Sequence, residues 1–194
     1  MKTLPLSNEL FICDYQIKSE QPNISATSHN EKTLAISRNI QYFHGKITLF
    51  AINKNATRLL QAFLESLRGQ QETFELELPD LEPLENLVGT PTLRADYPAG
   101  VSRISLDSFS GTIHAGDYFR LSNDNKLYRA LEDGTANNSF AISPSLRKAH
   151  KARDKATFQG CTLVVRLTDD AYTMQAHKGM TSVMKATITF KEAL

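Results

Sequence analysis

The sequence predicts a mainly β protein with one α-helix, because strand-like alternation recurs along the chain and a single segment has helical periodicity. Thr73 to Leu78 and Met184 to Phe190 alternate polar and apolar residues, as strands with one buried face do. Ala56 to Leu67 instead spaces its apolar residues three and four positions apart. Shorter strand patterns fill the middle of the chain, which indicates two domains, one of them discontinuous.

Length and composition narrow the class of protein further. The chain has 194 residues, of which 41% are hydrophobic, which suits one large or two small packed cores. A net charge of +1 gives no overall attraction to nucleic acid or to an anionic membrane. No segment approaches the roughly 20 apolar residues of a spanning helix, and the start lacks the apolar core of a signal peptide. We expect a protein made in the cytoplasm, with Cys13 and Cys161 as two buried thiols rather than a disulfide.

The first 85 residues predict strands on either side of a polar excursion. Glu9 to Tyr15 and Lys46 to Ile52 are the clearest strands, and the second is apolar on nearly both faces. Gln21 to Lys32 carries Pro, Asn, Ser and His without periodicity, which predicts an exposed loop and a candidate contact arm.

The helix is predicted over residues 56–68. Asn55 is placed to cap its first turn, and Gly69 to take the left-handed conformation that ends it. Arg68 complements the helix dipole at the C-terminal end.

The middle of the chain predicts an inserted domain of residues 86–160. Pro79 to Pro98 holds four of the seven prolines, which indicates a connector. Short strands follow at Ile104 to Phe109, Asp117 to Leu121, Lys126 to Leu131 and Phe140 to Ile142. This pattern favours a small barrel of the oligonucleotide/oligosaccharide-binding (OB) type, although a small sandwich would give a similar pattern.

Long strands return at the C-terminal end, at Thr162 to Leu167 and Met184 to Phe190, and strands need partners. We therefore expect residues 161–194 to pair with residues 1–85 in a discontinuous β-sandwich domain that carries the helix.

Residue spacings that support catalysis or metal binding are missing from the sequence. The five histidines, at positions 29, 44, 114, 150 and 177, form no zinc-binding spacing, and two cysteines form no CxxC. There is no GxSxG and no phosphate-binding glycine loop. We therefore expect no catalytic residue, metal or cofactor, and a protein that is not an enzyme.

A basic run near the end of the middle domain is the strongest charge feature. It contains Arg147, Lys148, Lys151 and Arg153. Phosphate binding through an OB-like barrel is one interpretation, but stacking platforms for nucleic acid need exposed aromatic rings, and only Phe158 lies near. A solvated face or a protein-contact surface is the favoured interpretation, so these four residues are candidate ligand or partner residues.

Several motifs, in order, resemble those of one family. Leu59 to Phe74 is similar to the helix-into-strand segment of the distal tail proteins of long-tailed (siphovirus-type) bacteriophages. The strand start Ala115-Gly116-Asp117-Tyr118-Phe119-Arg120, the strand Lys126-Leu127-Tyr128-Arg129 and the stretch Ile142-Ser143-Pro144-Ser145-Leu146-Arg147 resemble its middle module. Ile188 to Leu194 resembles its last strand. The resemblance covers the chain from about residue 35 to its end.

One departure from the family concerns tryptophan. Members often carry one before or at the start of the helix, whereas this chain has none, with Phe43 or Phe50 as the substitute.

The resemblance implies a structural virion protein at the tail tip. Such proteins form a homohexameric ring that joins the tail tube protein to the tip or baseplate hub protein, with DNA passing through the lumen. The inserted OB-like module then projects outward and holds side-fibre proteins or contacts host-surface sugar. Arg38, His44 and Lys46 are the candidate ring or tube contacts. No reaction, cofactor or membrane is implied.

Two other classes of protein compete with this interpretation. A monomeric carbohydrate-binding β-sandwich module is disfavoured by the absence of Trp and by only 6 Tyr, because sugar platforms use flat exposed rings. A hydrolase with scattered acidic residues has no supporting spacing.

Overall fold

The computed structural model describes residues 2–38, 40–78, 81, 83, 85–176 and 183–193. The predicted fold class is confirmed: the chain is mainly β, with one α-helix among these residues and one sheet that nearly closes into a barrel. Contacts divide the chain into two compact units. The first comprises residues 1–20, 42–76 and 164–194, and the second comprises residues 21–41 and 77–163.

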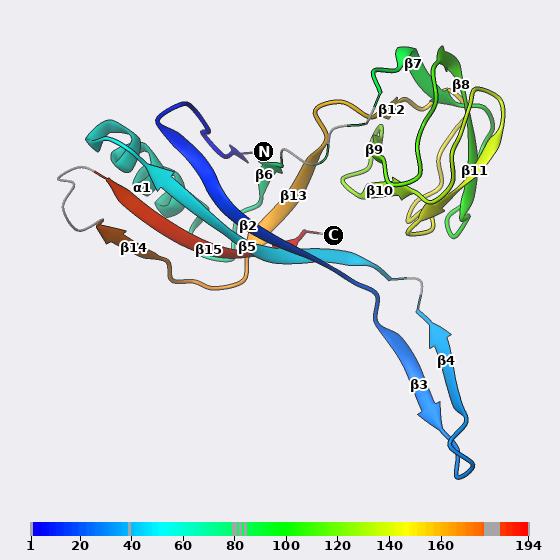
Figure 1. Ribbon diagram of the computed structural model, residues 1–194, viewed down its shortest axis with the longest axis horizontal. Helices are drawn as coiled ribbons and strands as arrows, with labels where there is room; N and C mark the ends of the chain where they lie inside the picture. The colour runs from blue at the N-terminus through cyan, green and yellow to red at the C-terminus, as the bar shows by residue number, and fades with distance from the viewer. Residues whose placement is uncertain are drawn as a thin grey trace. The chain divides into compact units, whose positions relative to one another are not determined.

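The first unit is a seven-stranded sheet with a helix against one face (Figure 1). The strand order is β1-β6-β13-β15-β5-β2, and β14 pairs with β15 beside β13. Its elements are β1 (Lys2–Thr3), β2 (Leu10–Glu20), β5 (Tyr42–Ala51), α1 (Lys54–Leu67), β6 (Phe74–Glu77), β13 (Thr162–Leu167), β14 (Thr173–Ala176) and β15 (Met184–Glu192). The C-terminal strand β15 pairs with β5 over eight residue pairs, so the two ends of the chain share one sheet.

Helix α1 buries one apolar stripe. The buried residues are spaced three and four apart, which places them on the side that packs against β2 and β5: Ala56, Leu60, Phe63, Leu64 and Leu67. Phe63 meets Phe74 of β6 edge to face, with ring centroids 5.6 Å apart. The hydrophobic core of the unit therefore lies between this stripe and one face of the sheet.

Both ends of α1 differ from the sequence-based expectation, because the helix begins at Lys54 rather than residue 56 and ends at Leu67, with Arg68 rather than Gly69 as the left-handed cap. The N-cap is Asn53, whose side-chain oxygen accepts from the Ala56 N–H at 2.8 Å, so the assignment of the cap to Asn55 was wrong. At the C-terminal end Arg68 takes the left-handed conformation, and Gly69 after it also has a positive φ. A Cβ on Gly69 would lie 2.6 Å from Asp170 Oδ1, so close approach adds to the need for glycine there.

The second unit contains a six-stranded antiparallel sheet of order β12-β9-β10-β11-β8-β7. Its strands are β7 (Val88–Leu93), β8 (Arg103–Ser110), β9 (Tyr118–Leu121), β10 (Leu127–Ala130), β11 (Ser139–Ser143) and β12 (Ala156–Thr157). The two end strands approach each other: Leu93 donates to Asp154 O at 2.9 Å, and Thr92 bridges Lys155. Rings of Phe119, Tyr128 and Phe158 stack in the interior, so the sheet encloses its own core.

Residues 23–37 form a two-stranded hairpin, not the irregular loop expected for Gln21 to Lys32. Strand β3 (Asn23–Thr27) pairs with β4 (Thr33–Ser37), and every residue of both strands is exposed. The expectation missed it because period-two alternation over only five residues is weak beside the surrounding Pro, Asn and Ser.

The unit boundaries fall at 76/77 and 163/164, whereas the sequence suggested 85/86 and 160/161. Strand β7 begins at Val88, within the segment expected to be a connector. Gly89 and Pro91 are tolerated in this strand because they lie at an irregularity in its pairing with β8.

We predict that Asn53→Ala lowers the free energy of unfolding of the first unit by about 1 kcal/mol, because the Ala56 N–H loses its cap. Asn55→Ala, inside the first turn, is the matched control and should change stability by less than about 0.5 kcal/mol, since alanine is the better helix former. Urea unfolding followed by circular dichroism measures both, and equal losses would contradict the assignment of the cap.

Candidate functional site

Strand β5 has two chemically different faces. Its odd-numbered residues Phe43, Ile47, Leu49 and Ala51 are buried on the side of α1. Its even-numbered residues point the other way, as alternation requires: Tyr42, His44, Lys46, Thr48 and Phe50. We call the sheet surface to which these even-numbered residues belong the polar face.

The register with the neighbouring strands extends the polar face across the sheet, because paired residues point to the same side. Lys18 and Lys191 flank His44, and Gln16 and Thr189 flank Lys46. Further rows are listed here from β2 to β15: Asp14, Thr48 and Thr187, then Phe11, Phe50 and Lys185. Strand β14 adds Thr173 beside Thr187 and Gln175 beside Lys185.

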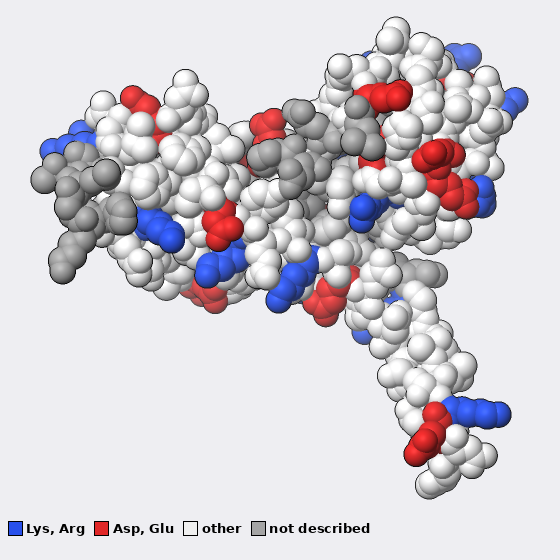
Figure 2. All heavy atoms as spheres, viewed as in Figure 1, with Lys and Arg blue, Asp and Glu red and all other residues white. Residues whose placement is uncertain are grey.

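The charges on this face nearly cancel. Five cations of the sheet point to this side: Lys18, Lys46, Arg166, Lys185 and Lys191. They are set among five acids: Asp14, Glu20, Asp169, which accepts from Thr189 Oγ1, and Glu75 and Glu77 of β6, which alternate with the buried Phe74 and Leu76. Figure 2 shows basic and acidic side chains interspersed on the visible side of the first unit. Such a surface attracts a polyanion only weakly, because opposite charges within a Debye length of about 8–10 Å offset one another.

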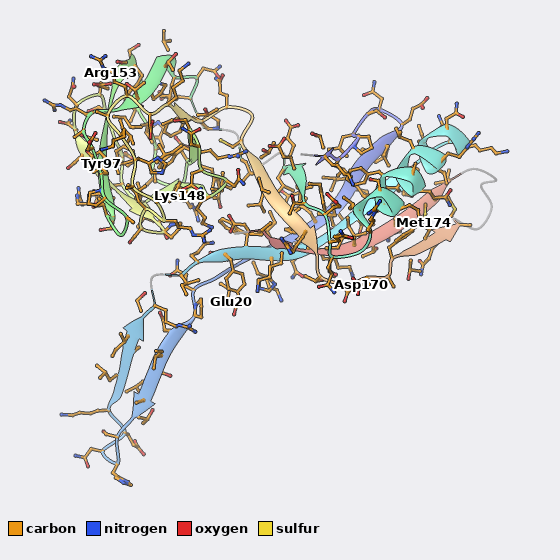
Figure 3. All side chains as sticks on the ribbon, turned by 180° about the vertical axis from the view of Figure 1, so that it is seen from behind. Glu20, Tyr97, Lys148, Arg153, Asp170 and Met174 are labelled. Carbon is orange, nitrogen blue, oxygen red and sulfur yellow. The ribbon has the colours of Figure 1, made fainter. Side chains whose placement is uncertain are left out.

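An aromatic and ionic cluster ends the polar face where β2 and β5 leave the sheet. Lys191 Nζ lies 4.2 Å from the centre of the Tyr42 ring, a cation–π contact. Glu20, labelled in Figure 3, lies at the end of β2 with a carboxylate oxygen 3.2 Å from His44 Nε2. Its hydrogen bond raises the pKa of the Tyr42 phenol, with desolvation contributing next.

Of the three contact residues predicted from sequence, only two lie on this face. His44 and Lys46 are two residues apart on β5. Arg38 follows β4 and is exposed in the other unit, so the structure does not group it with them. Sequence reasoning missed Lys18, Lys185 and Lys191. The alternation of Lys185, Thr187, Thr189 and Lys191 was a usable signal, but the register that aligns them with β2 was not readable.

The basic run of the second unit does not form one patch. Lys151 pairs with Asp96 at 2.9 Å, and Lys148 Nζ donates to the Asn123 carbonyl at 3.3 Å. Figure 3 shows Lys148 and Arg153 toward different ends of the unit. Arg153 has a positive φ and donates its N–H to Leu93 O at 2.7 Å, which ties the run to the barrel seam.

A buried polar network holds this loop. Tyr128 OH donates to Asp124 Oδ2 at 2.7 Å and accepts from the Arg147 N–H at 3.1 Å. His150, also buried, lies 3.1 Å from Asp154 through Nδ1 and 3.5 Å from Asp124 through Nε2. Burial, followed by the Asp124 carboxylate, raises the pKa of the Tyr128 phenol. The network fixes the backbone of the loop, which indicates a structural role.

The two cysteines are free and differ in environment. Cys161 is buried, donates to Thr157 O at 3.1 Å, and burial raises the pKa of its thiol to about 11. Cys13 is exposed at a bulge of β2, so the expectation that both thiols are buried was wrong for Cys13.

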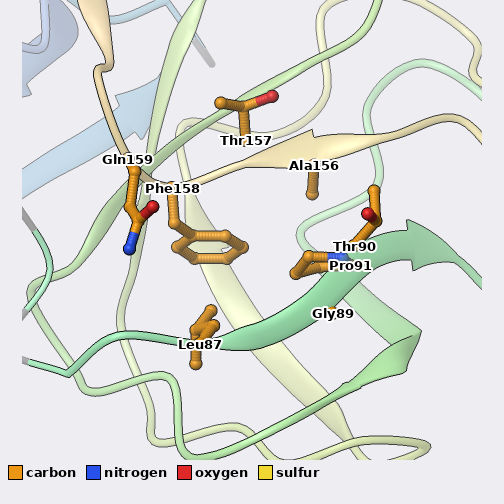
Figure 4. Close-up of a pocket in the computed structure, with 8 residues that line it drawn as sticks. All are labelled: Leu87, Gly89, Thr90, Pro91, Ala156, Thr157, Phe158 and Gln159. Atoms are coloured by element: carbon orange, nitrogen blue, oxygen red, sulfur yellow. The ribbon is translucent and has the colours of Figure 1, made fainter.

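A small pocket opens at the barrel seam between β7 and β12 (Figure 4). Leu87 and Phe158 face each other across it, and Gly89, Pro91 and Ala156 complete its apolar part. Its volume of about 170 Å³ is below the roughly 300–1,000 Å³ of typical small-molecule sites. The pocket is a gap in the seam that suits one side chain.

Within the described ranges, no three His, Cys, Asp or Glu side chains converge as metal ligands would. His177 lies outside those ranges. None of the helices in the described part of the chain is long and apolar enough to cross a membrane.

No protein-family model and no curated protein sequence matches the chain.

We predict that Tyr128→Phe lowers the free energy of unfolding of the second unit by roughly 1–3 kcal/mol, because a buried carboxylate and a backbone N–H each lose a partner. Lys148→Ala, an exposed residue of the same basic run, should change it by less than about 0.5 kcal/mol. Thermal unfolding of the full chain measures both. If Tyr128→Phe leaves the free energy of unfolding unchanged, the network does not anchor the loop.

Proposed function

We propose that this protein is a structural subunit of a bacteriophage tail tip that assembles into a homo-oligomeric ring, six subunits by family resemblance, around a DNA channel. The observation that carries the proposal is the antiparallel run β14-β15-β5-β2, which combines a near-neutral polar face with two edges that lack a strand partner among the described residues.

The strand directions of this run suit head-to-tail closure. Each strand is antiparallel to the next, so β2 and β14 run in opposite directions. If β2 of one copy lies beside β14 of the next, the new pair is again antiparallel and the sheet continues from copy to copy. A heterologous contact of this kind gives a closed ring when its rotation closes.

The edges themselves favour pairing with another chain. Strand β2 has 11 residues, and a long unpaired edge strand presents backbone N–H and C=O groups to any suitable partner. Its bulge between Ile12 and Asp14 and its charged Lys18 and Glu20 limit indiscriminate pairing. These features are consistent with an edge that pairs only with a matched partner.

The polar face suits the wall of a channel through which DNA moves. A strongly basic wall would release counterions and hold DNA tightly, whereas an acidic wall would repel it. Lysines interspersed with Asp14, Glu20 and Asp169 avoid both extremes. His44 and Lys46, proposed from sequence as tube or ring contacts, would then belong to the channel wall.

The remaining partners follow from the same proposal. The ring would join the tail tube protein to the tip hub protein in the virion, and the second unit would serve as the attachment module for side-fibre proteins or host-surface sugar. We assign it no reaction and no cofactor.

We predict a particle six times the mass of the 21.7-kDa chain, with a central hole by negative-stain microscopy. Native mass spectrometry over a concentration series measures the stoichiometry. A strict monomer that binds an oligosaccharide would contradict the ring and favour the carbohydrate-binding module.

We predict that the β2 edge is needed for the ring. Successive N–H groups of a strand point to opposite sides. Of the two variants Gln16→Pro and Ile17→Pro, one therefore removes a donor to β5 and the other removes a donor at the free edge. One variant should be destabilised, and the other should fold normally but fail to close the ring. Circular dichroism and native mass separate the two. If the variant that folds normally still forms rings of the wild-type mass, the edge assignment is overturned.

A further inference from the structure

The hairpin has one apolar and one polar face. Its register pairs Ile24 with Ile36 and Ala26 with Leu34, and these four side chains lie on the same side because alternate residues share a face. The opposite side carries Asn23, Ser25, Ala35 and Ser37 together with the Thr27 and Thr33 hydroxyls, which lie 3.3 Å apart.

None of the residues that the structure describes covers the apolar face. Ile24, Leu34 and Ile36 are 61%, 65% and 57% exposed, the values of side chains on a free surface. A two-stranded hairpin in water is at best marginally stable by itself. Contiguous exposed apolar side chains of this kind are typical of a surface that another chain covers.

A second exposed apolar cluster lies on the first unit, at the far ends of the strands that carry the hairpin. Phe11 and Phe50 pair across β2 and β5, with ring centroids 5.8 Å apart. Ile52 follows at the end of β5, where its N–H donates to Glu9 O at 3.0 Å. Phe11 is 39% and Ile52 is 42% exposed. We call these three residues the aromatic end.

The hairpin cannot cover the aromatic end of its own chain. Ile36 lies six residues before Tyr42 and Phe50 lies eight residues after it. At about 3.3 Å per residue, Ile36 reaches at most about 20 Å back along β5. Leu34, two residues further along the hairpin, would reach about 26 Å only if no residue were used to reverse the chain, and a turn of at least two residues shortens this to about 20 Å. Phe50 lies about 26 Å away, beyond both. Ile24 is nearer still to the point of attachment. A fold-back would also press apolar side chains onto Lys18, His44 and Lys46, which costs desolvation of charge.

We infer that the apolar face of the β3–β4 hairpin docks on the aromatic end of a second copy of this chain. The contact is heterologous: one copy gives its hairpin and receives another at the opposite end of the same two strands. It deepens the proposed function and rests on the self-assembly proposed above.

Two charged residues on the apolar face test the docking. Leu34→Asp with Ile36→Asp should weaken assembly of the full chain by at least about tenfold, because the contact buries those side chains. The matched control, Ser25→Asp with Thr27→Asp, adds the same charge to the polar face of the same hairpin and should leave assembly unchanged. Neither pair lies in a core, so both proteins should fold as the wild type does. Sedimentation velocity over a concentration series gives the assembly midpoint.

A disulfide between separate chains tests the receptor. One chain carries Ile36→Cys, a second and heavier tagged chain carries Ile52→Cys, and both carry Cys13→Ser. Mixing under mild oxidation should give a mixed dimer at least about tenfold faster than a mixture in which Ser25→Cys replaces Ile36→Cys. Equal rates would overturn the assignment of the aromatic end.

The outcomes separate this inference from the ring. Rings that form equally well with Leu34 and Ile36 charged would assign the apolar face to a different protein, overturning the inference and leaving the ring intact. Assemblies that need the hairpin but are open or of another stoichiometry would support the inference and contradict the ring. A strict monomer at the highest concentration measured would contradict both.

Discussion

The burial of the apolar face of strand β5 is the constraint on which the first unit depends. Helix α1 covers Ile47, Leu49 and Ala51, and the neighbours on β15 must bury Ala186, Ile188 and Phe190 on the same side. A shift of one residue in the β5–β15 register would exchange this set for Lys185, Thr187, Thr189 and Lys191. The apolar core thus fixes the register, and the register in turn assembles the polar face from lysines far apart in the sequence.

The structure of the second unit depends on closure of its sheet and on a buried hydrogen-bond network. Its sheet closes through backbone hydrogen bonds at Leu93. The loop that follows β11 is held by Tyr128, which hydrogen-bonds Asp124 and the Arg147 N–H, and by the hydrogen bond between His150 Nδ1 and Asp154. Buried polar groups are costly unless satisfied, so such a network rigidifies a loop that has no regular secondary structure. The network fixes the backbone of this loop, and that backbone sets the positions of the basic residues. They do not converge as they would around one ligand.

Periodicity in the sequence predicted the elements whose burial is regular. The apolar spacing from Ala56 to Leu67 gave the helix, and clean alternation from Met184 to Phe190 gave β15. It did not predict the hairpin, β7, β12 or β14, because these strands are short, exposed or interrupted by Pro91. Of the polar face, His44 and Lys46 were named from sequence, whereas Lys18, Lys185 and Lys191 join them only through long-range pairing, which no local pattern encodes.

Several features of the structure have in common that a single chain leaves them uncovered. A long edge strand, an edge of β14 that has no strand partner among the described residues, an apolar hairpin and a partly exposed aromatic pair each leave backbone groups or apolar side chains uncovered. They are not scattered, because all of them belong to, or are carried by, the four-strand run whose other surface is polar. A monomer would satisfy none of them, whereas a repeating head-to-tail contact satisfies an edge and an apolar surface on both sides of every copy. Because one repeated contact would cover both kinds of surface, we propose that the chain is one member of an assembly.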